Sequence, residues 1–128
     1  MRTVSINSKG ENKGHYSPGV ICNGMLYISG QLSLDPDTRK APEGGVEAHM
    51  LQALNNVDRV LKSAGLERSD VVQCRVYIDD INNWDAINGV YREFFGDHKP
   101  ARVVVPVPAL HFGCMVEIEA VADASKAR

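Results

Sequence analysis

The chain has 128 residues, 44% of them hydrophobic and 23% charged, so it is long enough to bury one hydrophobic core and too short for two. A formal net charge of −2 gives no electrostatic reason to expect binding to nucleic acid or to an anionic membrane surface. The N-terminal residues lack the apolar core of a signal peptide, and no apolar run approaches the roughly 20 residues that a membrane span requires. We therefore expect a single cytoplasmic domain over residues 1–128, with no nucleic acid and no membrane as partner.

The cysteines and histidines do not follow the spacing of a disulfide framework or a metal site. Cys22, Cys74 and Cys114 lie far apart, and their odd number fits reduced thiols in the cytoplasm better than a disulfide scaffold. The four histidines form neither a His-x-x-x-His pair nor a His/Cys cluster. We therefore predict no metal site.

The first half of the chain predicts a β-hairpin followed by a helix. Val4 and Ile6 can form a short edge strand before it. The pair Asn23-Gly24 separates two apolar runs and readily takes the positive φ values of a tight turn, which predicts antiparallel strands over 19–22 and 25–29. Residues 35–37 and 41–45 have turn and loop chemistry. From Val46 to Ala64 apolar residues recur every three or four positions, which predicts a helix that ends at Gly65.

The second half predicts a strand, a second helix and two more strands. Residues 71–78 alternate, and the predicted buried face consists of Val72, Cys74, Val76 and Ile78. Asn82 or Asn83 can cap the second helix, which should end at Gly96. Its expected apolar stripe is Trp84, Ile87, Val90 or Tyr91, and Phe94. The last two strands are predicted over 102–107 and 114–122.

This order of elements predicts an α+β fold in which two helices pack on one face of a mixed sheet. The opposite face of the sheet is then left without a helix to cover it. In the last strand, Val116, Ile118, Ala120 and Ala122 should face the helices, whereas Met115, Glu117, Glu119 and Val121 should face away. The mixture of carboxylates and apolar side chains on that second face suits partial burial by another subunit.

Arg102 opens the preceding strand and has the same parity as Val104. The other set, Val103, Val105 and Val107, is expected to face the core. An arginine can bind a carboxylate through two parallel hydrogen bonds, which a lysine cannot reproduce. If Arg102 and Glu117 line one pocket, the arginine can hold a substrate carboxylate while the glutamate acts on water. A structural ion pair between the two is the more ordinary alternative.

Several ordered motifs resemble those of the RidA/YjgF family over nearly the whole chain. They are His-Tyr-Ser-Pro-Gly at 15–19, Tyr-Ile-Ser-Gly-Gln at 27–31, segments 52–57, 76–81 and 87–95, Pro-Ala-Arg-Val at 100–103, and Val-Glu-Ile-Glu at 116–119. The resemblance implies a chorismate-mutase-like fold assembled as a homotrimer, with active clefts between subunits. It also implies hydrolysis of reactive 2-imino or enamino acids to 2-oxo acids and ammonia, without a cofactor. The expected partner is thus a small carboxylate-bearing imine or 2-oxo acid.

The resemblance assigns roles to individual residues. Arg102 and Glu117 would be catalytic, the first clamping the substrate carboxylate and the second positioning or activating the attacking water. The substrate-binding residues would be Tyr16, Ser29, Gly30, Asn88 and Val104. An imine carbon is already electrophilic, so a fixed substrate, an oriented water and a proton relay can suffice.

Some residues depart from the family pattern. Active members carry a cysteine two residues after the arginine, where this chain has Val104, whose backbone can still contact the substrate but which supplies no thiol. Pro106 and Pro108 suggest an edge strand or an early strand end. These departures indicate a divergent branch and keep open an alternative, a non-catalytic regulatory trimer that binds small carboxylates such as 2-oxo acids. Chaperone-like or RNA-cleaving behaviour has little support without a basic face.

Overall fold

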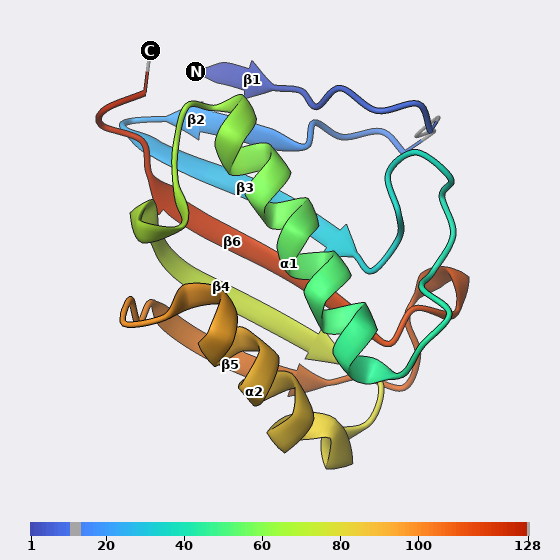
Figure 1. Ribbon diagram of the computed structural model, residues 1–128. Helices are drawn as coiled ribbons and strands as arrows, with labels where there is room; N and C mark the ends of the chain where they lie inside the picture. The colour runs from blue at the N-terminus through green and yellow to red at the C-terminus, as the bar shows by residue number, and fades with distance from the viewer. Residues whose placement is uncertain (11–13, 128) are drawn as a thin grey trace.

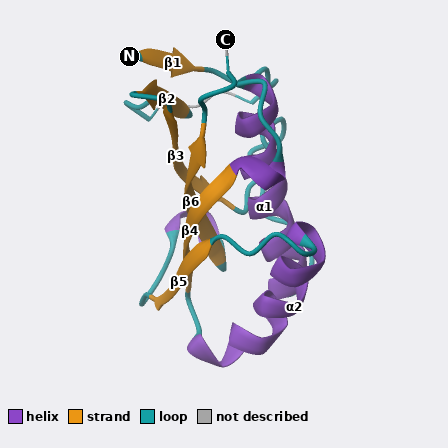
Figure 2. Ribbon diagram, turned by 90° about the vertical axis from the view of Figure 1, so that its left-hand side faces the viewer, coloured by secondary structure: helices purple, strands orange, loops and turns teal. Residues whose placement is uncertain are grey.

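The computed structural model, which describes residues 1–10 and 14–127, is a mixed sheet with two helices on one face (Figures 1 and 2). The six strands lie in the order β1-β2-β3-β6-β4-β5. Their bounds are Arg2–Val4 (β1), Gly19–Cys22 (β2), Met25–Leu32 (β3), Val71–Ile78 (β4), Ala101–Pro106 (β5) and Val116–Asp123 (β6). The helices are α1 (Val46–Ser63) and α2 (Trp84–Phe95). The predicted α+β class is therefore confirmed.

The core lies between the helices and the sheet. On β6, Val116, Ile118, Ala120 and Ala122 are all at most 4% exposed, while the residues between them are partly exposed on the opposite face. This alternation agrees with the parity predicted for the last strand. Figure 2 shows that no helix of the described chain covers that opposite face.

The hairpin has the predicted turn but a longer second strand. Asn23 and Gly24 both have positive φ, 53° and 76°, and Cys22 pairs with Met25. Strand β3 continues to Leu32, and its pairing with β6 is interrupted by a bulge between Ile28 and Gln31. The bulge adds a residue on one strand and turns neighbouring side chains, which matters for the site. Strand β1 forms at the edge of the sheet and includes Val4 but not Ile6.

Both helices end at the predicted glycines, whereas neither begins with a side-chain cap. After α1, Gly65 has φ 76°, and the backbone N–H of Leu66 donates to the Leu61 carbonyl at 2.8 Å, a Schellman-type end. Gly96, with φ 63°, ends α2 as predicted. The predicted side-chain cap by Asn82 or Asn83 is wrong. A 3₁₀ turn, Ile81–Asn83, precedes α2, and the Asp80 carboxylate accepts the Asn82 N–H at 2.9 Å.

The predicted buried face of β4 is confirmed for Cys74, Val76 and Ile78 and wrong for Val72, and the predicted faces of β5 are wrong. On β4, a bulge between Val71 and Gln73 buries Val71 and leaves Val72 46% exposed. On β5, Val103 is 44% exposed and Val104 packs against the core. The reason is the parallel pairing with β4, which sets Arg102 opposite the buried Cys74.

Strand β5 lies at the edge of the sheet and ends at Pro106, as the prolines predicted. In α2, Ile87, Tyr91 and Phe94 are buried, whereas Trp84 is 37% exposed and lies at the rim. No helix in the described part of the chain has the length and apolarity needed to cross a membrane.

Candidate active site

Arg102 is held in place by α2. Its Nη1 donates to Asn88 Oδ1 at 2.9 Å, and its guanidinium carbon lies 4.7 Å from the centre of the Tyr91 ring and 5.4 Å from that of Trp84. The amide fixes the direction of the fork, and the aromatic faces favour the cation. Within residues 1–10 and 14–127, no carboxylate forms an ion pair with Arg102. The side chain is therefore a pre-oriented, half-buried cation with its charge unpaired by the described chain.

A pocket of about 360 Å³ opens beside Arg102. It lies between α2, the loop after α2 and the start of β5, and its walls include Asn88, Tyr91, Phe95, Pro100 and Arg102. The rings exclude water while the guanidinium and the amide supply hydrogen bonds. This combination suits a small ligand that carries a carboxylate.

Glu117 lies on the other side of the sheet, above the bulge of β3. A Cβ at Gly30 would lie 2.8 Å from Glu117 Oε2, so a side chain at this position would displace the carboxylate from where it lies. Burial and, to a lesser degree, the charge of Glu119 raise the pKa of Glu117 above its ordinary 4.5, and the nearby His111 lowers it in part. A carboxyl group with a raised pKa is suited to exchange protons near neutral pH.

Glu119 has the same parity as Glu117 but a different environment. It accepts a hydrogen bond from the Tyr77 hydroxyl at 2.5 Å and pairs with Arg75 Nη1 at 3.6 Å. Glu117 makes neither kind of bond to any described side chain. Of the two carboxylates, Glu117 is thus the one left available for a ligand or a water.

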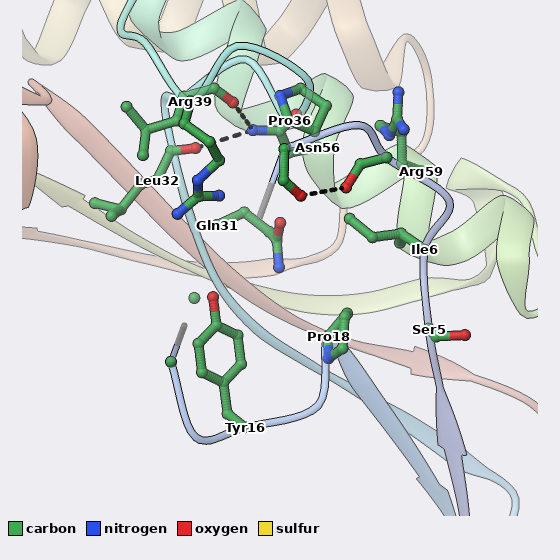
Figure 3. A pocket seen from close by; sticks show the side chains of 15 residues that line it. Ser5, Ile6, Tyr16, Pro18, Gln31, Leu32, Pro36, Arg39, Asn56 and Arg59 are labelled. Carbon is green, nitrogen blue, oxygen red and sulfur yellow. Dashed lines mark hydrogen bonds between the residues drawn. The ribbon is translucent and has the colours of Figure 1, made fainter. Parts of the chain in front are cut away.

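Gly30 lies next to Glu117, and Ser29 links it to the loop that carries Tyr16. Ser29 Oγ donates to the Ser17 carbonyl at 2.6 Å, and its N–H donates to the Pro18 carbonyl at 2.9 Å. These bonds tie the loop that carries Tyr16 to the bulge of β3. Tyr16 and Gly30 line a second pocket, of about 350 Å³ (Figure 3).

The predicted site residues therefore form two groups in one chain, and Arg102 and Glu117 lie on opposite faces of the sheet. Arg102 pairs with Cys74, whose side chain is buried under the helices, whereas Glu117 pairs with Tyr77 on the other face. Asn88 belongs to the Arg102 group, and Val104 points into the core beside it. A structural ion pair between Arg102 and Glu117 within one chain is excluded.

Two features of the candidate site were not predicted from the sequence: the contacts of Trp84 and Tyr91 with Arg102, and the effect of His111 on the pKa of Glu117. Trp84, Asn88 and Tyr91 follow the i, i+4, i+7 spacing of one helix face, and this spacing was the signal for their joint contact with Arg102. The effect of His111 on Glu117 had no such signal, because a loop brings the imidazole there. In the described ranges, no group of three or more His, Cys, Asp or Glu side chains is arranged to hold a metal ion.

The fold and the two groups define a small α+β protein with an oriented arginine that no described carboxylate pairs and a glutamate whose pKa is raised. The family model described as Endoribonuclease L-PSP matches residues 7–124. The chain therefore belongs to this family, the RidA/YjgF family.

Relatives and solved structures support this assignment. The chain is 43% identical to a goat (Capra hircus) 2-iminobutanoate/2-iminopropanoate deaminase over 85% of this chain and 80% of the relative. It is 44% identical to a RutC family protein of Aquifex aeolicus over 95% and 98% of the two chains. The crystal structure of E. coli TdcF with bound serine superposes with a TM-score of 0.89 at 32% identity, covering 96% of this chain and 98% of that one.

Proposed function

We propose that this protein hydrolyses reactive 2-imino or enamino acids to 2-oxo acids and ammonia. The observation that carries the proposal is Arg102, a half-buried cation oriented by Asn88 and two aromatic rings and unpaired by any carboxylate of the described chain. The names of relatives at about 40% identity, 2-iminobutanoate/2-iminopropanoate deaminases, support the same chemistry. The unpaired cysteines fit a cytoplasmic location.

The reaction follows from these side chains. Arg102 holds the substrate carboxylate through two hydrogen bonds and so fixes the imine carbon. A water beside Glu117 gives a proton to the Glu117 carboxylate, while the water oxygen bonds to the imine carbon. Glu117 passes this proton to the nitrogen, which gives a tetrahedral intermediate that carries a hydroxyl and an amino group on the same carbon. Glu117 then takes the hydroxyl proton and passes it to the nitrogen as the C–N bond breaks, so the nitrogen leaves as ammonia. The water oxygen becomes the 2-oxo oxygen of the product.

The separation of the two groups supports a site shared between copies in a homotrimer. Arg102 of one copy would meet Glu117, Tyr16 and Gly30 of a neighbour. The face of the sheet without helices carries Tyr27, 51% exposed, and Val103, 44% exposed, among charged side chains. Such a mixed face is typical of an interface between subunits.

The proposal is tested by the rate of 2-oxo acid release from imines generated in place by an amino-acid oxidase. The wild-type protein should accelerate this release above the spontaneous rate. Arg102→Lys should lower kcat/KM by about 100-fold, because lysine cannot form the two-point clamp. Arg68→Lys is the matched control, since Arg68 is occupied by Asp58 and the Phe94 carbonyl away from the site. No acceleration across several imines would refute the deaminase.

A second candidate is a non-catalytic trimer that binds 2-oxo acids. The side chain of Val104 offers no thiol and points into the core, so any chemistry that needs a thiol at this position is absent. This candidate predicts that 2-oxo acids raise the Tm of the wild-type protein through Arg102 while no imine is turned over.

A further inference from the structure

A pocket bordered by Gly30, the residue next to the Glu117 carboxylate, contains an arginine that the proposed chemistry does not use. The pocket, of about 350 Å³, lies between the N-terminal segment, β3, the loop before α1 and α1 itself, which contributes Asn56 and Arg59. Tyr16, Gly30 and Gln31 line it together with Arg39. In Figure 3, the Arg39 side chain extends into the pocket toward Gln31, and the Tyr16 hydroxyl points into the same space from the opposite side.

The loop holds Arg39 in a fixed and unusual conformation. Arg39 has φ 61°, in the left-handed region that favours glycine, and its N–H donates to the Asp35 carbonyl at 2.8 Å. The Asp35 carboxylate in turn accepts the N–H groups of Asp37 and Thr38. The stem of Arg39 packs on Gly10, where a Cβ would lie 2.8 Å from Arg39 Cγ. A strained backbone that directs one side chain into a cavity points to a functional role.

The charge of Arg39 is not neutralised by the described residues, none of which forms an ion pair with it. The nearby carboxylate of Asp35 is engaged by backbone N–H groups. Arg59, the other arginine of the pocket wall, donates its Nη2 to the Asn7 carbonyl instead. The pocket wall therefore presents two guanidinium groups, those of Arg39 and Arg59, that form no ion pair with a described carboxylate, and the ligand that fits it is an anion.

We propose that this pocket binds a second carboxylate, so that the preferred substrates are dicarboxylic 2-imino acids, those derived from amino acids such as glutamate or aspartate. This inference rests on the proposed function. The 2-carboxylate would lie on Arg102 of a neighbouring copy, and the imine carbon beside Glu117. The substrate side chain would pass Gly30 and end at Arg39. Imines with short apolar side chains leave this guanidinium without a partner.

The test compares kcat/KM for imines generated from glutamate and from alanine. In Arg39→Gly, the ratio of the two values should fall about 10- to 100-fold, the effect of losing a charge-assisted hydrogen bond. Glycine suits φ 61°, so this variant should fold at least as well as the wild type. Lys40→Gln is the matched control, because Lys40 is exposed, lies next in the chain and does not line the pocket. An unchanged ratio in Arg39→Gly would overturn the inference.

A binding measurement separates this inference from the proposed function. If the wild type turns over neither imine, the deaminase proposal fails while the subsite can still be tested. In that case 2-oxoglutarate should raise the Tm more than 2-oxobutanoate does, and Arg39→Gly should abolish the difference. Equal stabilisation of the wild type by both acids would show that Arg39 binds no second carboxylate.

Discussion

Glu117 and Glu119 are two residues apart on the same face of β6, yet their surroundings separate their roles. Glu119 is occupied by Tyr77 and Arg75, whereas Glu117 lies over Gly30 and bonds to no described side chain. Burial is the main cause that raises the pKa of Glu117. Two like carboxylates with different environments are a common way to fix which one exchanges protons.

The pH dependence of the reaction should follow Glu117. As a base it must be ionised, so kcat/KM should fall as pH drops through a pKa above 4.5. Glu119→Gln should move this fall in kcat/KM, the acid limb of the pH profile, to lower pH, because the substitution removes a negative charge that raises the pKa of Glu117. His111→Gln should move it to higher pH, because it removes a charge that lowers this pKa. The measurement is a pH profile of kcat/KM for the three proteins.

Glutamine at position 119 can still accept the Tyr77 hydrogen bond, so the stability of Glu119→Gln at pH 7 serves as a control for intact folding. Glu117→Gln should have no acid limb and little activity. Acid limbs that coincide in the wild type, Glu119→Gln and His111→Gln would show that Glu117 is not the titrating base.

Helix α2 orients Arg102, which lies on the neighbouring strand β5. Trp84, Asn88 and Tyr91 lie on one face of α2, and all three contact Arg102. The arginine is thus oriented by a rigid element rather than by a loop.

Two substitutions of Asn88 should weaken substrate binding to different extents. Asn88→Ala removes one hydrogen bond and should lower kcat/KM about 10-fold. Asn88→Asp keeps the shape but introduces a carboxylate at the 2.9 Å position, which would neutralise Arg102 and compete with the substrate. The loss should therefore be larger in Asn88→Asp, measured both as kcat/KM and as the Tm increase given by a 2-oxo acid. The reverse order would contradict the role of Arg102 as the carboxylate clamp.

Helix α1 is linked to the strands of the site through His49. The Nδ1 atom of this buried side chain lies 2.7 Å from Ser33 Oγ and accepts the Met115 N–H at 3.2 Å. Ser33 follows the end of β3, and Met115 directly precedes β6, which carries Glu117. His49 therefore holds together the two strand ends next to the site.

The stability of the protein should depend on pH through His49. Burial lowers its pKa below 6.5, with Asp79 opposing in part, so the folded protein keeps the imidazole neutral. Above pH 6.5 the imidazole is neutral in both the folded and the unfolded chain, so the protein has its full free energy of unfolding. Below pH 6.5 the unfolded chain binds a proton that the buried imidazole does not, and the free energy of unfolding falls until the pH reaches the lower pKa of the folded state. Each unit by which folding lowers this pKa corresponds to about 1.4 kcal/mol. The decrease in Tm between pH 7 and pH 5 should be smaller in His49→Gln than in the wild type. An equal decrease would contradict this.

Local chemistry made most elements predictable. Asn23-Gly24, Gly65 and Gly96 specify their turns and helix ends, and β6 shows its two faces by strict alternation. The face of Val72 and that of Arg102 were not predictable in the same way. A bulge in β4 turns Val72 to the exposed face, and the face of Arg102 depends on the register between β5 and β4. Register and bulges are set by contacts between distant segments, which periodicity does not report.

The residues of the candidate site could be named from the sequence and its family resemblance, but their arrangement in space could not. Arg102, Asn88, Glu117 and Gly30 were all named from the sequence, and the structure gives each a specific contact. Their division into two groups follows from strand order and pairing, since β4 and the pleat separate Arg102 from Glu117. Arg39 falls between two segments predicted as turn and loop, and nothing in the neighbouring sequence indicates the cavity.

For the whole molecule, the position of Arg102 and Glu117 on opposite faces leads to a complementation experiment. Arg102→Ala and Glu117→Gln should each be inactive alone. If the site is shared between neighbouring copies of a trimer, each mixed trimer contains one site with both residues intact. Random mixing by unfolding and refolding the two variants together should then restore about one quarter of the wild-type activity.

The control is the same treatment of each variant by itself, which should restore nothing. If the mixture stays inactive while it elutes as a trimer on size-exclusion chromatography, the two residues do not share a site across an interface. If it elutes as a monomer, the proposed trimer is wrong.

The position of β5 at the edge of the sheet has a consequence for the tendency of the chain to aggregate. Residues 103–105 are three consecutive valines on an open edge, the kind of segment that recruits further strands and starts aggregation. Pro106 ends this strand, and Pro108 follows two residues later, so the apolar run cannot lengthen into a continuous ladder of hydrogen bonds. We therefore expect the two prolines to oppose aggregation through this edge.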